Sequence, residues 1–197
     1  YPHIVKSVAK PKLHKAILRF DMTGFMIHGN PFGPVTYMLW VTREKGDKRE
    51  SPGGRLGIDM SAGGADINAG ILYVNYDGTE DATTSFELDV NWNGLSIWSE
   101  VSQRGDDIKG NYVVLGYDIA LGDRELTPYV LMDSMEVTAT DEATNTSVTV
   151  KQEQQAFGIN YRPRPTAVFK LESASYKADE DADAVKSYNV AFAYFFN

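Results

Sequence analysis

Apolar and polar side chains alternate with a period of two along most of the chain, from about residue 16 to its end. In one stretch, Phe86 and Leu88 alternate with Glu87 and Asp89. This period is typical of β-strands that have one apolar and one polar face. No long amphipathic helical pattern interrupts it. The pattern therefore predicts an all-β chain.

Eleven stretches have the length and alternation of strands. They are residues 16–28, 35–44, 55–62, 66–77, 84–93, 95–104, 110–121, 126–138, 150–162, 166–177 and 185–196. A weaker candidate, residues 3–9, precedes them. We accordingly divide the chain into an N-terminal segment, residues 1–15, and a β-domain, residues 16–197.

The connections between the predicted strands alternate in length and character. One set is tight and rich in Gly, Asn and Pro: residues 29–34, 62–65, 92–94, 121–124 and 162–165. The other set is mostly longer and charged: residues 44–53, 77–84, 103–110, 139–149 and 176–186. Transmembrane barrels have short periplasmic turns and longer external loops. The alternation therefore predicts an antiparallel transmembrane β-barrel.

The same alternation sets the direction of each predicted strand. Strands 185–196 and 16–28 both run toward the tight turns. Bacterial single-chain barrels have an even number of strands, so one strand of the opposite direction is needed. Either residues 3–9 supply it, giving about 12 strands, or the chain is the C-terminal part of a larger barrel. The chain starts at Tyr1 without a signal peptide, which fits a processed chain or a fragment.

The last predicted strand has a continuous apolar and aromatic face. We expect this face to contact the membrane. Its residues are Tyr188, Val190, Phe192, Tyr194 and Phe196.

Composition narrows the function classes. The formal net charge is −8 and the pI is about 4.9, which argues against nucleic-acid binding. The chain has no cysteine, so disulfides and thiolate metal sites are excluded. No apolar run reaches the roughly 18–20 residues of a membrane-spanning helix.

A diffusion channel needs a lumen lined by polar and charged side chains, because an ion is poorly solvated in a narrow apolar tube. Alternation assigns twelve charged residues to the lumen: Arg19, Asp21, Arg55, Asp59, Glu87, Asp89, Glu100, Asp118, Asp133, Arg162, Lys170 and Glu172. The set is more acidic than basic, which predicts a weak preference for cations.

The sequence offers little for catalysis or metal binding. His3, His14 and His28 have no metal-binding spacing, and no Gly-x-Ser-x-Gly elbow is present. Carboxylates alternate in residues 179–183 as at the start of an EF-hand, but Ala184 replaces the required glycine. We expect no enzyme activity, no metal and no cofactor.

Aromatic residues leave two alternatives open. Candidates for membrane-interface girdles are Trp40, Trp92, Trp98, Tyr117, Tyr129, Tyr161, Tyr194 and Phe196. In a secreted soluble β-sandwich, the same residues would form the core or bind carbohydrate. In a small non-conducting barrel that anchors or holds a partner, Phe25, Trp40, Trp98 and Phe195 would help to fill the lumen.

Three stretches resemble phosphate-selective porins of the O and P type. They are residues 34–41 with 53–56, residues 112–121 with 126–130, and residues 157–165 with 168–172. The resemblance covers roughly residues 19–196 and corresponds to the C-terminal part of a 16-stranded porin. Leu131 stands where such porins often have a lumen-facing arginine, and Asn197 follows the usual terminal aromatic residue.

The resemblance implies a bacterial outer-membrane channel for small hydrophilic solutes or ions. The expected partners are outer-membrane lipid and lipopolysaccharide, with a possible homotrimer and no nucleic acid. The aromatic C-terminal strand looks like the signal that outer-membrane proteins present to their assembly machinery.

Overall fold

A computed structural model describes residues 22–44, 50–75, 82–141, 146–179 and 182–194. These residues form twelve β-strands in one antiparallel sheet and contain no helix, so none of the described segments is a helix able to cross a membrane. The all-β antiparallel prediction is confirmed. The described residues do not form a sandwich of two packed sheets.

The strands are β1 Met22–Phe32, β2 Val35–Glu44, β3 Glu50–Ala62, β4 Ala65–Val74, β5 Thr83–Trp92, β6 Leu95–Arg104, β7 Ile108–Tyr117, β8 Ile119–Leu121, β9 Arg124–Asp141, β10 Thr146–Arg164, β11 Ala167–Lys177 and β12 Val185–Tyr194. Most strand ends agree with the predicted ranges to within about three residues, but β1 ends four residues later than predicted, and β3 and β10 begin five and four residues earlier. Each strand pairs with its sequence neighbour, except that β7 and β8 both pair with β9.

The predicted strand 110–121 is divided at Asp118. The backbone N–H of Asp118 donates to the carbonyl of Gly94 (2.8 Å) at the end of the pairing between β6 and β7. Gly116 and Ile119, on either side, keep the same register against β9. β8 is therefore a continuation of β7 along β9.

One end of the sheet carries five two-residue turns. Both residues of the Gly63-Gly64 and Asn93-Gly94 turns have positive φ, between 48° and 83°. This conformation matches the twist of a β-hairpin and is easily adopted by glycine and asparagine. We call this the turn end of the sheet, and the opposite end the loop end.

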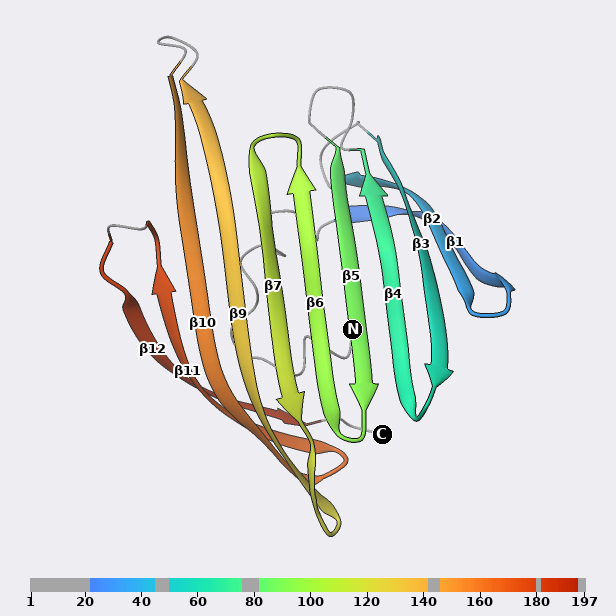
Figure 1. The fold of residues 1–197 in the computed structure, drawn as a ribbon, viewed down its shortest axis with the longest axis vertical. Coiled ribbons are helices and arrows are strands. Elements are labelled where there is room, and N and C mark those ends of the chain that lie inside the picture. Colours follow the sequence, from blue (N-terminus) through green and yellow to red (C-terminus); the bar gives the residue numbers. More distant parts are fainter. Residues whose placement is uncertain (1–21, 45–49, 76–81, 142–145, 180–181, 195–197) are drawn as a thin grey trace.

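The loop-end connections are longer, as predicted, and range from three residues between β6 and β7 to eight between β4 and β5. Three predicted loops are wrong in extent. β3 begins at Glu50, inside the loop expected at 44–53. The loop expected at 103–110 is a three-residue turn, and most of the loop expected at 139–149 belongs to β9 and β10. With 18 and 19 residues, these two strands extend past their neighbours (Figure 1). β9 pairs with β7 only as far as Val137.

Prolines shift the register near two of the turns. The pairing of β1 with β2 shifts between Gly29 and Phe32, around Pro31, and that of β10 with β11 shifts between Tyr161 and Arg164, around Pro163. Proline cannot donate a ladder hydrogen bond. The strands nevertheless continue to the two-residue turns, so the turns expected at 29–34 and 162–165 are shorter than predicted.

The two edge strands run in the same direction, toward the turn end. β1 pairs with β2 and β12 with β11, and among the described residues neither edge strand pairs with the other. An all-antiparallel closure therefore needs a strand of opposite direction between them. Residues 3–9, the weak strand candidate, lie outside the described residues.

Candidate functional site

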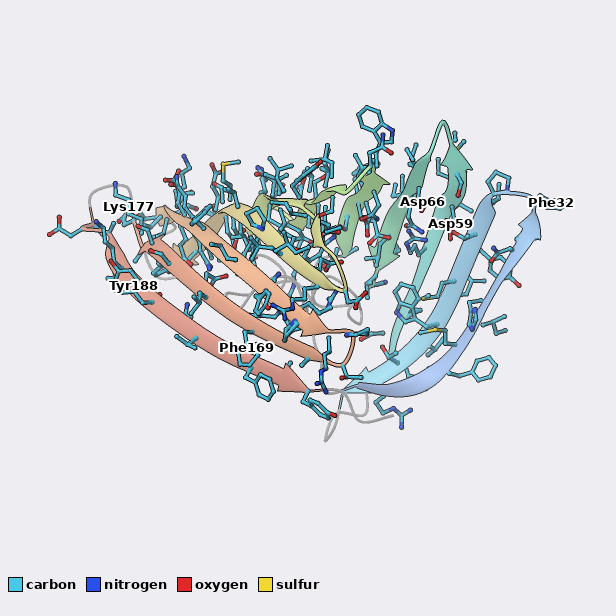
Figure 2. All side chains as sticks on the ribbon, turned by 90° about the horizontal axis from the view of Figure 1, so that it is seen from below. Phe32, Asp59, Asp66, Phe169, Lys177 and Tyr188 are labelled. Atoms are coloured by element: carbon cyan, nitrogen blue, oxygen red, sulfur yellow. The ribbon has the colours of Figure 1, made fainter. Side chains whose placement is uncertain are left out.

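The sheet is strongly curved, and its two faces differ in chemistry. Figure 2 shows Phe32, Phe169 and Tyr188 pointing away from the sheet on its outer side, with Asp59 and Asp66 on the inner side. We call these the convex face and the concave face. Cross-strand register assigns the other residues, because paired residues in a ladder lie on the same face.

Burial is inverted relative to a soluble protein. The buried polar and charged residues are all on the concave face: Ser51, Thr83, Ser85, Ser96, Glu100, Ser102, Thr127, Asp133, Gln154, Asn160, Lys170 and Glu172. The exposed large hydrophobic residues are all on the convex face, except Met26, Val148 and Val185. Large contiguous exposed apolar patches are rare on soluble monomers.

The convex apolar residues form continuous rows. Leu56 of β3 pairs with Ile71 of β4, Ile71 with Phe86 of β5, and Phe86 with Val101 of β6. Also on the convex face, between the last two strands of the sheet, the rings of Phe169 and Phe192 lie 4.8 Å apart. An apolar belt thus crosses strand after strand.

The ends of this belt are marked by different residue types. At the loop end, exposed Arg43 and Glu50 form an ion pair (2.9 Å) one step beyond the apolar pair Val41 and Pro52. At the turn end, exposed aromatic residues include Trp92, Tyr117 and Tyr194.

The expected aromatic girdle is therefore only partly correct. Trp40, Trp98 and Tyr129 lie on the concave face, because their register partners Gly53, Asp89 and Gly158 do. Phe25 is also on the other face from the one expected. It pairs with Val41 on the convex face and is exposed, so it does not fill the inner side. Phe195 and Phe196 are outside the described residues.

Four of the five residues of the C-terminal strand predicted to contact the membrane, Tyr188, Val190, Phe192 and Tyr194, lie together on the convex face, and Phe196 is outside the described residues. Tyr188 is the most exposed of them, at 81%. Val190 pairs with Leu171 and Phe192 with Phe169, so the strand extends the apolar belt to the edge of the sheet.

The charged residues predicted to line a lumen share the concave face wherever the structure describes them. These are Arg55, Asp59, Glu87, Asp89, Glu100, Asp118, Asp133, Arg162, Lys170 and Glu172. Arg19 and Asp21 lie outside the described residues.

Arg55 is the best-anchored cation of this face. It donates to Glu87 through Nε, to Asn68 through Nη2 (2.6 Å) and to Thr36 through Nη1 (3.2 Å). Its guanidinium lies over Gly57 and Gly70, where an added Cβ would come within 2.6–2.7 Å of it. The two glycines therefore leave the space in which the guanidinium lies flat.

We expect Arg55→Lys to lower the free energy of unfolding by about 1–2 kcal/mol, because an ammonium group cannot reproduce the planar set of donors. Urea titration of the folded protein in detergent would measure it. Arg124→Lys, in a turn-end position that is exposed, is the matched control and should change little. Equal effects of the two substitutions would contradict the role given to Arg55.

Glu100 is the centre of a buried polar cluster. It is 7% exposed and accepts hydrogen bonds from the hydroxyls of Ser85 (2.7 Å), Ser102 and Tyr112 (2.8 Å). In register, Glu100 lies between Glu87 and Tyr112. Three hydroxyl groups thus donate to this buried carboxylate. Alternation predicted Glu100, but not the serine and tyrosine hydroxyls that hold it.

A second cluster crosses β9, β10, β11 and β12. The Tyr129 ring lies over Gly158, where an added Cβ would be 2.3 Å from Cζ, and its hydroxyl donates to Glu172 two strands away. Asn189 donates to the other oxygen of Glu172 (3.2 Å). No pattern in the sequence identified this arrangement. A tyrosine and a glycine alternating with apolar residues on neighbouring strands could have suggested it.

The concave face also carries an apolar cluster. Its buried members are Tyr112, Val114, Tyr129, Leu131, Met135, Ala156 and Ala174, with Trp98, Ile108 and Val137 packed against them. Trp98 and Tyr112 meet edge to face with their centroids 4.6 Å apart. Leu131, at the position where the resemblance would place an arginine, is 0% exposed.

Charged groups are more accessible toward the turn end. Asp59 and Asp66 are exposed and Asp89 is partly exposed. Asp59 and Asp89 flank Asn68 in register. Arg162 pairs with Glu125 (2.6 Å) in the same region of the sheet. This part of the concave face is therefore both wetted and predominantly acidic.

Within the described strands and connections, no group of three or more His, Asp or Glu side chains is placed to hold a metal ion. His28 is exposed on β1, and His3 and His14 lie outside the described residues.

No protein-family model matches the chain, and no curated protein matches it significantly. The functional argument therefore depends on the two faces of the sheet.

Proposed function

We propose that this chain forms the wall of an outer-membrane barrel of the porin type, a channel for passive diffusion of small hydrophilic solutes or ions. The observation that carries the proposal is the inverted burial of the sheet, with a continuous apolar convex face and a charged concave face. The apolar face needs a lipid environment, and the polar face needs water.

The height of the apolar belt supports contact of the convex face with a membrane. On β4 the belt runs from Ala65 to Tyr73, about 27 Å along the strand. With a strand tilt of about 40°, this corresponds to about 20 Å across the membrane, close to the roughly 25 Å band of known barrels. The aromatic residues at the turn end fit one interface, and the polar loop end fits the other.

The connections support an orientation. Short turns lie on the periplasmic side and longer loops on the external side of transmembrane barrels. The turn end would then face the periplasm, and the long β9/β10 hairpin would project outward. A strand running toward the loop end is required between β12 and β1 for closure.

A non-conducting barrel is the second candidate, and the concave apolar cluster around Leu131 favours it. Such a cluster narrows the space available to solutes. The secreted carbohydrate-binding sandwich has less support, because the part of the chain that the structure describes forms one sheet rather than two. Membership of the phosphate-selective porin family and assembly into a trimer are proposals that rest on the resemblance. Leu131, buried where such porins often have an arginine, gives no support for anion selectivity.

Planar-bilayer recording of the protein purified in detergent tests the proposal. We expect stepwise conductance and heat-modifiable migration in gels. Insertion without conductance would favour the non-conducting barrel. A monodisperse protein in buffer without detergent would contradict both.

The acidic turn end predicts a preference for cations. In a salt gradient, we expect the reversal potential to have the sign of cation selectivity, and Asp59→Asn with Asp66→Asn and Asp89→Asn to reduce it, because exposed carboxylates attract counter-ions. Asn91→Asp, which adds one carboxylate on the same face, should shift the potential in the opposite direction. Strong anion selectivity of the unmodified channel would contradict this prediction.

A further inference from the structure

Two methionines and a histidine meet on the concave face where β1 pairs with β2. Met26 pairs with Trp40, and His28 pairs with Met38. Because Trp40 is on the concave face and residues two apart on a strand share a face, all four side chains are on it. They occupy adjacent positions at the edge of the sheet that β1 forms (Figure 1).

The spacing of a β-sheet brings these side chains within reach of one point. Paired residues of an antiparallel ladder have Cβ atoms about 4.5–5.5 Å apart, and diagonal neighbours are about 7–8 Å apart. His28 and Met38 are a direct pair, and Met26 and Met38 are diagonal neighbours. Methionine is unbranched and has several rotatable bonds. Two thioether sulfurs and the imidazole can therefore converge above the sheet.

Exposure distinguishes these residues from core residues. Met26 is 50% exposed and His28 is also exposed, while Met38 is half-buried. Among the residues that the structure describes, Met26 is one of three exposed large hydrophobic residues that are not on the convex face. It is part of neither the apolar belt nor the buried apolar cluster. Its sulfur is therefore accessible on the charged face.

The chemistry of this set favours a soft, monovalent cation. Thioether sulfur is a soft ligand that selects Cu⁺, and imidazole also binds copper. The hard cations Mg²⁺ and Ca²⁺ need oxygen ligands, which these side chains lack. Arg55 is the register partner of Met38 on β3, but its charge is matched by that of Glu87. An ion with a single charge is repelled less by this arginine than a divalent ion.

The Trp40 indole adds a second attraction. It lies over Gly53 of β3, where an added Cβ would come within 2.5–2.7 Å of three indole atoms. The ring therefore lies across the surface of the sheet. The face of a tryptophan ring attracts cations, and Trp40 is the register partner of Met26.

We propose that Met26, His28 and Met38 bind one Cu⁺ ion through the two thioether sulfurs and an imidazole nitrogen, with the Trp40 ring beside it. This differs from the absence of metal expected from the sequence. The histidine spacing gave no sign of the site, because the other ligands are methionines. The site is independent of the proposed channel, since it needs only the pairing of β1 with β2.

Titration of the full chain, folded in detergent, with Ag⁺ tests the proposal. Ag⁺ shares the ligand preference of Cu⁺ and is stable in air. In chloride-free buffer, isothermal calorimetry should show one ion bound per chain. Met26→Leu and Met38→Leu should each weaken binding at least about tenfold, since loss of a group that merely orients a metal ligand already costs about 10–100-fold. Met60→Leu, at an exposed position on the convex face of β3, is the matched control and should bind like the parent protein.

NMR of the parent protein, labelled at the methionine methyl groups, gives an answer that does not depend on the folding of variants. The chain has six methionines, and Ag⁺ should shift the methyl resonances of Met26 and Met38 alone. Absence of stoichiometric binding, equal weakening by Met60→Leu, or shifts confined to other methionines would overturn the proposal. Binding of Zn²⁺ as tight as that of Ag⁺ would also overturn it, because zinc sites in proteins use thiolate, imidazole and carboxylate ligands.

Discussion

Replacing Leu88 by arginine is expected to lower the free energy of unfolding in a bilayer by about 2–4 kcal/mol. Leu88 is on the convex face of β5, midway along the apolar belt, and is 38% exposed. In a soluble protein, an arginine at such a position would change stability by no more than about 0.5 kcal/mol. In a membrane, its charge must leave water or distort the bilayer.

Two matched substitutions on the same strand make this result specific. Asn91→Arg places the same charge on the concave face, where it meets water and acidic residues, and should have little effect. Trp92→Arg is on the convex face but at the turn end, where the cost of a charge falls to about 0–1 kcal/mol. Reversible urea unfolding in lipid vesicles would measure all three. A similar effect at Leu88 and Asn91 would contradict membrane contact of the convex face.

Gly158→Ala is expected to be nearly as damaging, although it adds only one methyl group. The added Cβ would lie 2.3 Å from Cζ of the Tyr129 ring, so the ring must leave its place on the strand. Overpacking costs about 1–3 kcal/mol, and a lost hydrogen bond to a charged group costs about 1.5–3 kcal/mol. We expect a total loss of about 3 kcal/mol in the free energy of unfolding.

A double-mutant cycle identifies the cause. Tyr129→Ala removes the ring, and Gly158→Ala in that background should cost less than about 0.5 kcal/mol. Tyr129→Phe keeps the ring and removes only the hydroxyl donor to Glu172, so it separates the hydrogen bond from the packing. If Gly158→Ala lowers the free energy of unfolding equally with and without the Tyr129 ring, the contact with that ring is not the reason why a side chain is disfavoured at position 158.

Strand positions and turns could be predicted because their causes are local. Alternation of side chains reports a two-faced strand directly, and Asn93-Gly94 or Gly63-Gly64 marks a hairpin by the positive φ that these residues adopt readily. The concave assignment of Arg55, Glu87 and Glu100 followed from the same period. The ends of β9 and β10 were missed because residues 139–149 are polar and Thr-rich, which also suits a loop.

The prediction that Phe25 lies on the inner face was wrong for a geometric reason. Counting back from the turn by twos would place Phe25 on the concave face, but the shift between Gly29 and Phe32 adds one residue to β1. Each bulge exchanges the two faces for the residues beyond it. Such a shift depends on pairing with β2, which the alternation within β1 does not contain.

The sequence alone determined that this protein is built of antiparallel, two-faced strands with short turns at one end, because these properties depend on neighbouring residues. Only the tertiary structure decided which face is concave, where the charged groups meet and where space is left between them. Arg55 over Gly70 and Tyr129 over Gly158 each join residues of different strands. Their contacts arise from cross-strand register, which is settled only when the sheet forms.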